Sequence, residues 1–147
     1  MRLTVYSDYA LRMLIYLAIK TDGLATVGEI AEAYGISKNH LTKVAHELGI
    51  RGYVETVRGR GGGLRLARPA GEIGLGEIVR QTEPDMALVP CFAPINDDCA
   101  IARCCVLKDV LHKAGDAFLG VLDGYTLEDL ARSPKPLQSL LSIAETP

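Results

Sequence analysis

The fold is decided by residues 26–48, which read TVGEIAEAYGISKNHLTKVAHEL. Thr26, with Glu29 three residues later, forms a capping box, which predicts the start of a short helix that Gly35 ends. Ser37 is a favoured N-cap residue and predicts a further helix at once. The inner face of this second helix is expected to carry Leu41, Val44, Ala45 and Leu48. Two helices joined by a three-residue turn indicate a helix-turn-helix.

The segments on either side complete a winged helix-turn-helix. Before it, Ser7 is expected to cap a helix that Gly23 ends. After it, the alternating residues 52–57 and 64–67 flank the glycine-rich residues 58–63, which predicts a β-hairpin. The apolar stripe of the first helix consists of Leu11, Leu14, Ile15, Ala18 and Ile19. The predicted fold class is therefore mainly α with a small β-hairpin.

The second half of the chain is expected to carry a long dimerisation helix. Residues 73–83 predict a helix that Pro84 ends, residues 85–100 predict a loop, and the long helix runs from about Ile101 to Asp123. Its apolar seam has the spacing 4, 3, 4, 3, 4 and consists of Leu107, Leu111, Ala114, Phe118, Val121 and Tyr125. One helix cannot bury such a seam alone, so either the winged helix or a second copy of the chain covers it. A helix-turn-helix usually reads two half-sites, which favours the homodimer.

The domain prediction is one compact unit with two regions. Residues 1–70 form the winged helix-turn-helix DNA-binding region, and residues 71–147 hold the cysteine loop and the dimerisation helix. Thr126 is expected to cap a last short helix, and the tail after Pro134 is expected to be loosely held.

Charge and hydropathy narrow the class of protein. The net charge of -2 divides into +4 for residues 1–70 and -6 for residues 71–147, so only the first region is basic enough to favour phosphates. No apolar run reaches the roughly 20 residues of a membrane span, and the N-terminus lacks the pattern of a signal peptide. A cytoplasmic location is therefore expected, where structural disulfides are rare.

Two polar segments are candidate contacts for double-stranded DNA. The start of a recognition helix needs small polar and cationic side chains, because base edges offer donors and acceptors and the flanking phosphates are negative. A glycine-rich wing with arginines is typical of a shape-reading contact in the minor groove. The candidate residues are Ser37, Lys38, Asn39, His40, Thr42 and Lys43 on the helix and Arg58, Gly59 and Arg60 on the wing.

Three cysteines mark a candidate metal site. Cys91, Cys99 and Cys105 have the spacing C-x7-C-x5-C, which lacks the C-x2-C knuckle of most zinc sites. Inert core thiols, a redox dithiol, zinc and an iron-sulfur cluster are the alternatives, and the polar loop argues against core thiols. Cys104 and Cys105 are neighbours, so only one of them is expected to be a ligand. A fourth ligand must then be a carboxylate, a histidine, a small molecule or a group from another subunit.

No pattern of an enzyme is present. A nucleophile with its base, paired carboxylates and a phosphate-binding loop are all missing, and residues 58–63 lack the Lys-Ser/Thr that would follow a P-loop. His112 lies two helical turns beyond Cys105, about 10 Å along the axis, which is too far to share a small cluster.

The chain resembles the iron-sulfur winged-helix regulators that include NsrR and IscR, and within them it is most similar to the NsrR branch. The resemblance covers nearly the whole chain. It is carried by Leu3-Thr4, residues 7–12, His40-Leu41, Lys43-Val44, residues 52–54, residues 58–64, residues 78–80 with Glu83, the cysteine loop, Leu107-Lys108, residues 117–119, residues 125–127 and Asp129-Leu130.

This resemblance implies a homodimeric repressor of nitric-oxide detoxification genes that releases DNA once nitric oxide attacks the iron of its cluster. It implies that Cys91, Cys99 and Cys105 are the thiolate ligands and that Asp8 of the partner subunit is the fourth. It also favours a 4Fe-4S cluster over 2Fe-2S. IscR-like members place a histidine three residues after the third cysteine, where this chain has Lys108.

Two other functions stay open from the sequence. A regulator of iron-sulfur or iron status has the same fold and the same thiolates. A thiol redox switch forms disulfides among the cysteines and binds no metal. The sequence does not define the operator or the target genes.

Overall fold

The computed structural model describes residues 2–92 and 99–143. Helix α1 (Val5–Ile19) begins earlier than predicted, because Thr4 is its N-cap and its hydroxyl accepts from the Ser7 amide at 3.2 Å. Ser7 lies inside the helix and is buried, so its prediction as the cap was wrong. The helix also ends before Gly23, because Lys20 adopts an extended backbone.

The helix-turn-helix is confirmed. Helix α2 (Val27–Tyr34) starts with the complete Thr26 capping box and ends at Gly35, which has a left-handed backbone with φ 63°. Helix α3 (Lys38–Ile50) follows Ser37, which holds the N-cap position without a side-chain capping bond. The predicted inner residues are all buried, namely Leu41, Val44, Ala45 and Leu48.

The wing is an antiparallel hairpin of β1 (Val54–Val57) and β2 (Gly63–Leu66), with Val54 opposite Leu66. Its tip needs glycine for the turn itself, because a Cβ at residue 62 would lie 2.3 Å from the Val57 carbonyl oxygen. On the other edge of the hairpin, Ala25 forms a bridge with Leu64.

A second group of helices follows the wing. After the short 3₁₀ turn η1 (Ala70–Glu72) comes α4 (Leu75–Thr82), which confirms the helix predicted before Pro84. The turns η2 (Pro90–Phe92) and η3 (Ala102–Cys104) precede α5 (Val106–Asp123). The predicted loop at residues 85–100 includes residues 93–98, which lie outside the described residues.

The long helix therefore starts about five residues later than predicted. Cys105 is the N-cap of α5 and has ψ 98°, which is incompatible with a helix running through it. Cys104 lies in η3, so Cys104 and Cys105 do not share one α-helix as the sequence had suggested.

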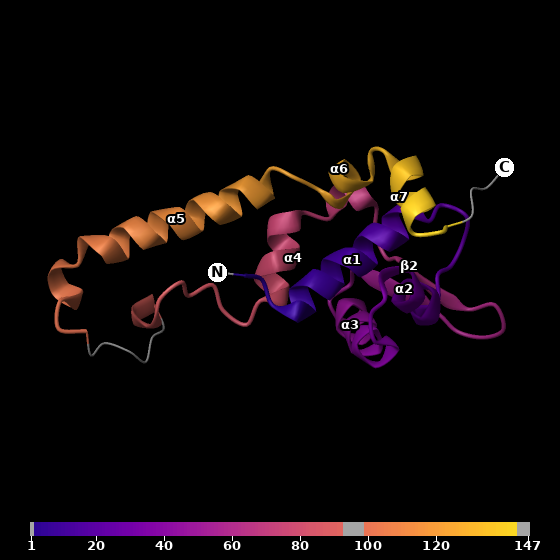
Figure 1. Cartoon of the computed structure of the whole chain (residues 1–147), viewed down its shortest axis with the longest axis horizontal. Helices are drawn as coiled ribbons and strands as arrows, with labels where there is room; N and C mark the ends of the chain where they lie inside the picture. Colours follow the sequence, from indigo (N-terminus) through magenta and orange to yellow (C-terminus); the bar gives the residue numbers. More distant parts are fainter. Residues whose placement is uncertain (1, 93–98, 144–147) are drawn as a thin grey trace.

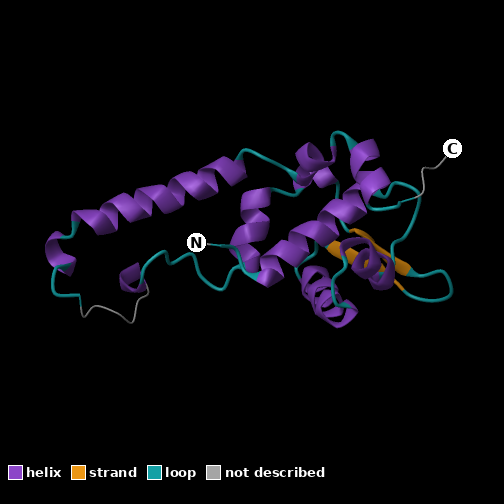
Figure 2. Ribbon diagram, in the orientation of Figure 1, coloured by secondary structure: helices purple, strands orange, loops and turns teal. Residues whose placement is uncertain are grey.

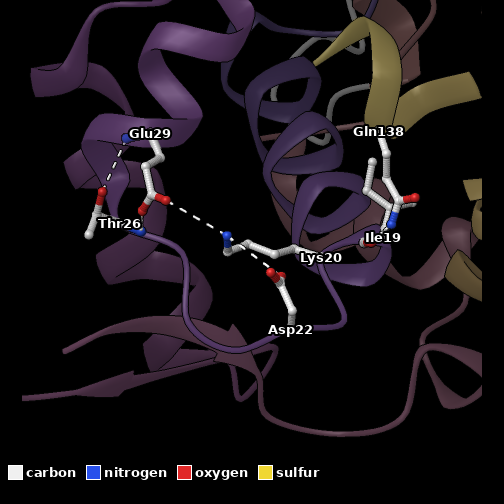
Figure 3. Close-up of polar contacts among 6 residues, drawn as sticks. All are labelled: Ile19, Lys20, Asp22, Thr26, Glu29 and Gln138. Atoms are coloured by element: carbon white, nitrogen blue, oxygen red, sulfur yellow. Dashed lines mark hydrogen bonds and ion pairs between the residues drawn. The ribbon is translucent and has the colours of Figure 1, made fainter. Parts of the chain in front are cut away.

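The C-terminal residues return to α1. Helix α6 (Leu127–Ala131) begins with the predicted Thr126 cap. The tail after Pro134 was predicted to be loosely held, which is wrong for its described part. It forms α7 (Pro134–Leu140), and Gln138 Nε2 donates to the Ile19 carbonyl oxygen at 2.7 Å (Figure 3).

Lys20, the residue after Ile19, forms ion pairs with two carboxylates. Its Nζ lies 3.8 Å from Asp22 Oδ1 and 3.7 Å from Glu29 Oε1.

Two parts of the molecule differ in how they are packed. The body, residues 2–83 and 125–143, contains every buried apolar side chain of the described chain. The arm, residues 84–92 and 99–124, extends away from the body with α5 along one side (Figures 1 and 2). The arm re-enters the body next to a bridge between Gly74 and Thr126. No helix among the described residues is long and apolar enough to cross a membrane.

Candidate DNA-binding surface and cysteine segment

The start of α3 presents a polar, cationic surface. All six candidate residues, Ser37, Lys38, Asn39, His40, Thr42 and Lys43, are exposed. The Thr42 hydroxyl donates to the Lys38 carbonyl oxygen at 2.9 Å, which leaves its lone pairs as acceptors. The His40 ring lies 6.3 Å from the ring of Tyr9, so this surface contacts α1 directly. The amide groups at the helix start add partial positive charge.

The wing tip is also exposed and cationic. Arg58, Gly59 and Arg60 are solvent-accessible, and neither arginine forms an ion pair with any described residue. Lower on the hairpin, Arg65 is neutralised by Glu55 across the strands at 2.9 Å. The free charge of the hairpin is therefore concentrated at the tip, where a phosphate or a minor groove could receive it.

The cysteines lie at the far end of the arm. Cys91 is in η2, Cys99 precedes η3 and Cys105 is the N-cap of α5. All four thiols of the chain are free, and Cys104 is exposed with its sulfur directed at the Ile101 carbonyl oxygen at 3.7 Å. The first amides of α5 face the Cys105 side and stabilise negative charge there, which suits a thiolate ligand.

Asp8 lies on α1 and forms an ion pair with Arg12, with Arg12 Nε 3.0 Å from Asp8 Oδ2. Its side chain is 46% exposed. The guanidinium of Arg12 also lies over the Tyr34 ring, 5.7 Å from its centroid. The carboxylate is therefore held at the surface, where a group outside this protomer can reach it.

One protomer does not gather the candidate ligands. Among the described residues, no three Cys, His, Asp or Glu side chains lie close enough to hold a metal ion. Helix α1, which carries Asp8, and the start of α5 lie far apart in the chain (Figure 1). The donor chemistry nevertheless fits an iron-sulfur cluster, since three free thiols and one accessible carboxylate make four ligands.

Sequence reasoning missed the contact between α1 and the root of the arm. Glu83 Oε1 accepts from the Thr4 amide at 2.8 Å, from the Thr4 hydroxyl at 3.0 Å and from the Ser7 hydroxyl. Burial raises the pKa of Glu83, but these hydrogen bonds outweigh it and bring the pKa below its ordinary value. Glu83 had been noted only among the residues that carry the family resemblance. The bonds connect the residue before the arm with the turn that carries Asp8.

A second missed network joins the wing to α4. The buried Tyr53 hydroxyl donates to Glu77 Oε1 at 2.8 Å, and Arg68 Nη2 donates to the same oxygen at 2.6 Å. Burial, and then the bond to Glu77, raise the pKa of Tyr53. One turn further along α4, Arg80 binds Asp123 of α5 through two bonds of 2.6 and 2.7 Å. These pairings join residues 9 to 43 positions apart, so local patterns could not reveal them.

An apolar hollow of about 620 Å³ lies between the first part of the arm and α5. Its walls include Met86, Leu88 and Phe118, and Phe92 stacks on His112 with ring centroids 3.8 Å apart. Next to Cys91, the segment therefore contacts α5 through the Phe92 ring.

Known proteins resemble this chain over nearly its whole length. The family model Rrf2, described as "Iron-dependent Transcriptional regulator", matches residues 3–133. The HTH-type transcriptional regulator NsrR of Bacillus subtilis is 50% identical over 146 residues, which cover 99% of this chain and 100% of the relative. NsrR of Halalkalibacterium halodurans is 49% identical over 97% of this chain and 99% of the relative.

Solved structures share the fold. CymR, the global cysteine regulator of B. subtilis, has a TM-score of 0.73 at 28% identity and covers 90% of this chain and 97% of its own. T. potens IscR has a TM-score of 0.73 at 26% identity, covering 99% and 94%.

Proposed function

The chain belongs to the Rrf2 family, as a transcriptional regulator and not an enzyme, and from that premise we propose that it is a cytoplasmic, homodimeric repressor whose iron-sulfur cluster senses nitric oxide. The observation that carries the proposal is the identity of about half, over the full length, to relatives named NsrR. The resemblance read from the residues implies the same branch, and Lys108 stands where IscR-like members have histidine.

The uncovered arm supports the homodimer. No residue of the 18-residue helix α5 is buried, and Leu107, Val110 and Val121 are each more than half exposed. The chain exposes 9458 Å² of surface, about 2,100 Å² more than a compact monomer of this mass would expose. That excess is of the size that stable subunit interfaces cover on each partner. The body leaves the seam uncovered, so a second copy is the natural occupant.

The exposed cations support a two-part contact with double-stranded DNA. Lys38 and Lys43 at the start of α3 suit phosphates that flank a major groove, and Asn39 and His40 can reach base edges. Arg58 and Arg60 at the wing tip would reach the neighbouring backbone or minor groove. The dimer would present two such surfaces to two half-sites.

Cys91, Cys99 and Cys105 would hold the cluster, and Asp8 of the partner subunit would be the fourth ligand. The cluster, when bound, supplies iron that nitric oxide attacks, and an oxygen ligand binds soft iron less firmly than thiolate does. Following the family resemblance, we propose a 4Fe-4S cluster and not 2Fe-2S. On the side of the protein, Asp8 stands one residue from Tyr9, which contacts His40 of the DNA-reading helix. Release of the Asp8 carboxylate would therefore change the contact between α1 and α3 directly.

Anaerobic reconstitution of three variants, followed by nitric-oxide titration under absorption spectroscopy and gel shift, tests the proposal. Cys105→Ala is expected to abolish the cluster, Cys104→Ala to spare it, and Asp8→Ala to leave a labile or altered cluster because three thiolates remain. Loss of the cluster in Cys104→Ala with retention in Cys105→Ala would shift the ligand assignment by one residue. An unchanged spectrum and an unchanged nitric-oxide response in Asp8→Ala would rule out Asp8 as the fourth ligand.

The same preparation separates two rival functions. A colourless protein whose cysteines form disulfides would identify a thiol redox switch. A coloured protein whose DNA binding follows cluster loading and ignores nitric oxide would identify a regulator of iron-sulfur or iron status. A duplex selected by the protein from a random pool supplies the DNA for each assay.

A further inference from the structure

One carboxylate on α4 holds both ends of the wing. Tyr53 lies immediately before β1 and Arg68 lies two residues after β2, and both donate to the same oxygen of Glu77. The Arg68 guanidinium also lies over the Tyr53 ring at 5.0 Å, and Arg68 Nη1 donates to the Glu72 carbonyl oxygen at 3.2 Å. The base of the hairpin is closed by the Ala67 amide, which donates to the Tyr53 carbonyl oxygen at 2.9 Å.

The position of this carboxylate sets the direction of the wing. A short antiparallel hairpin is stiff along its length, so a change of angle at its base is enlarged at its tip. Arg58 lies five residues beyond Tyr53, about 16 Å along an extended strand. A tilt of roughly 10° at the base would therefore move the tip by about 3 Å, enough to break a hydrogen bond, whose length varies by only about 0.5 Å.

Helix α4 is itself fixed to the arm. Arg80 binds both carboxylate oxygens of Asp123, at the end of α5. Gly76 leaves the space for this pair, since a Cβ there would lie 1.9 Å from Asp123 Oδ1. The wing, α4 and the end of α5 are thus joined by consecutive polar contacts through Glu77 and Arg80.

We propose that Glu77 is the positioning residue of the wing, and that its bonds to Tyr53 and Arg68 aim Arg58 and Arg60 at DNA. The proposal rests on the proposed function, because it assumes that the wing tip contacts DNA. Glu77 itself lies at the base of the hairpin and needs no contact with DNA.

The direction of the change in DNA affinity on mutation of Glu77 distinguishes a positioning role from an effect of its charge alone. Removal of a negative charge from a DNA-binding protein strengthens binding when only long-range electrostatics act. Loss of a correctly aimed wing weakens binding. Glu72 is an exposed acid near the same network, and its side chain forms no bond with the described residues. Glu72→Ala is therefore a matched control for charge.

The experiment is a double-mutant cycle on the full-length dimer. The variants are Glu77→Ala, the wing variant Arg58→Ala with Arg60→Ala, and their combination. The probe is a duplex selected from a random pool by the unaltered protein, and the readouts are affinity and its salt dependence. Glu77→Ala is expected to lower affinity about tenfold and to reduce the salt slope as the wing variant does. In the wing-variant background, Glu77→Ala should not lower affinity further, and Glu72→Ala should not weaken binding.

Other outcomes would overturn the proposal in distinguishable ways. If the wing variant loses affinity and Glu77→Ala does not, Glu77 does not position the wing. If the two effects simply add, Glu77 acts through another part of the protein. If the wing variant itself binds normally, the assigned role of the wing in DNA binding fails as well. Glu77→Gln and Tyr53→Phe, which keep the packing and remove the charge or one hydrogen bond, should each show a smaller loss in the same direction if Glu77→Ala proves unstable.

Discussion

The arm has a higher proportion of apolar residues than the body, yet only the body buries them. In the body, α1, α3 and α4 enclose fully buried side chains such as Met13, Leu41 and Ile78. In the arm, α5 has a regular apolar seam and no buried residue. The body can therefore bury its core within one chain, whereas the apolar face of α5 is available for the proposed association of two chains.

The largest expected effect comes from a charge on the exposed apolar face of α5, beside the seam. Val110→Asp would place an unpaired carboxylate in the proposed interface, where burial of a lone charge costs several kcal/mol. We expect a monomer in sedimentation velocity and a loss of DNA affinity on the order of 100-fold, because one half-site contact is no longer linked to the other. Leu140→Asp changes an even more exposed apolar residue on the body, 81% exposed against 53% for Val110, and should leave the dimer intact. A dimeric Val110→Asp protein would contradict the contrast between body and arm.

A core truncation should affect stability and not assembly. Leu41 of α3 is fully buried, so Leu41→Ala is expected to lower the free energy of unfolding by about 2–5 kcal/mol. The matched truncation is Leu107→Ala in the monomeric Val110→Asp background, where the side chain is 62% exposed and has little packing to lose. Urea unfolding at fixed protein concentration measures both. Equal losses in the two would show that the arm is packed in the monomer.

The contact between body and arm root should give a smaller, pH-dependent effect. Hydrogen bonds from Ser7 and Thr4 keep the pKa of Glu83 below its ordinary 4.5 against the effect of burial. A depressed folded-state pKa stabilises the fold above the unfolded value, and that contribution disappears as the pH falls through the folded value. Glu83→Gln should therefore cost about 1 kcal/mol at pH 7. Its difference from the unaltered protein should shrink below about pH 4 in thermal unfolding. If the stability difference between the two proteins stayed constant across that pH range, the charge of Glu83 would not be its cause.

The smallest effect is expected on the outer face of the hairpin. Arg65 and Glu55 pair in solvent, where side-chain entropy and screening cancel most of the attraction. Arg65→Ala should leave the melting temperature unchanged within error in a scan of the dimer. A clear decrease would mean that the hairpin is stabilised from its surface and not from Tyr53, Val54 and Leu64.

The elements with local signals were predictable from the sequence. The Thr26 and Thr126 capping boxes, the Gly35 turn and the hairpin are each defined by neighbours within a few residues. Thr4 was overlooked as a cap because Ser7 is equally suited by type, and the difference is the distant acceptor Glu83. The start of α5 was misplaced because the apolar spacing continues upstream while the backbone turns at Cys105. Helix α7 was missed because its support is the contact of Gln138 with Ile19.

The candidate site was less accessible to sequence reasoning than the fold. Cys91, Cys99, Cys105 and the cationic residues of α3 and the wing were identified by type and spacing, and their roles stay predictions. Asp8 was assigned only through the family resemblance, since an isolated aspartate on a helix has no distinguishing pattern. The supporting carboxylates Glu77 and Glu83 depend on tertiary contacts, which no local window contains.

The bridge between Gly74 and Thr126 has a consequence for how the protein is made. Leu127 and Ile143, which complete the core over α1, are synthesised after the whole arm. Because the ribosome releases the chain from its N-terminus, the apolar face of α1 stays exposed until α6 and α7 have been synthesised. The nascent chain therefore exposes two apolar surfaces at the same time, namely the incomplete core and the α5 seam. In the proposed homodimer, closure of the body by the last residues would cover the first surface before two protomers meet through the second.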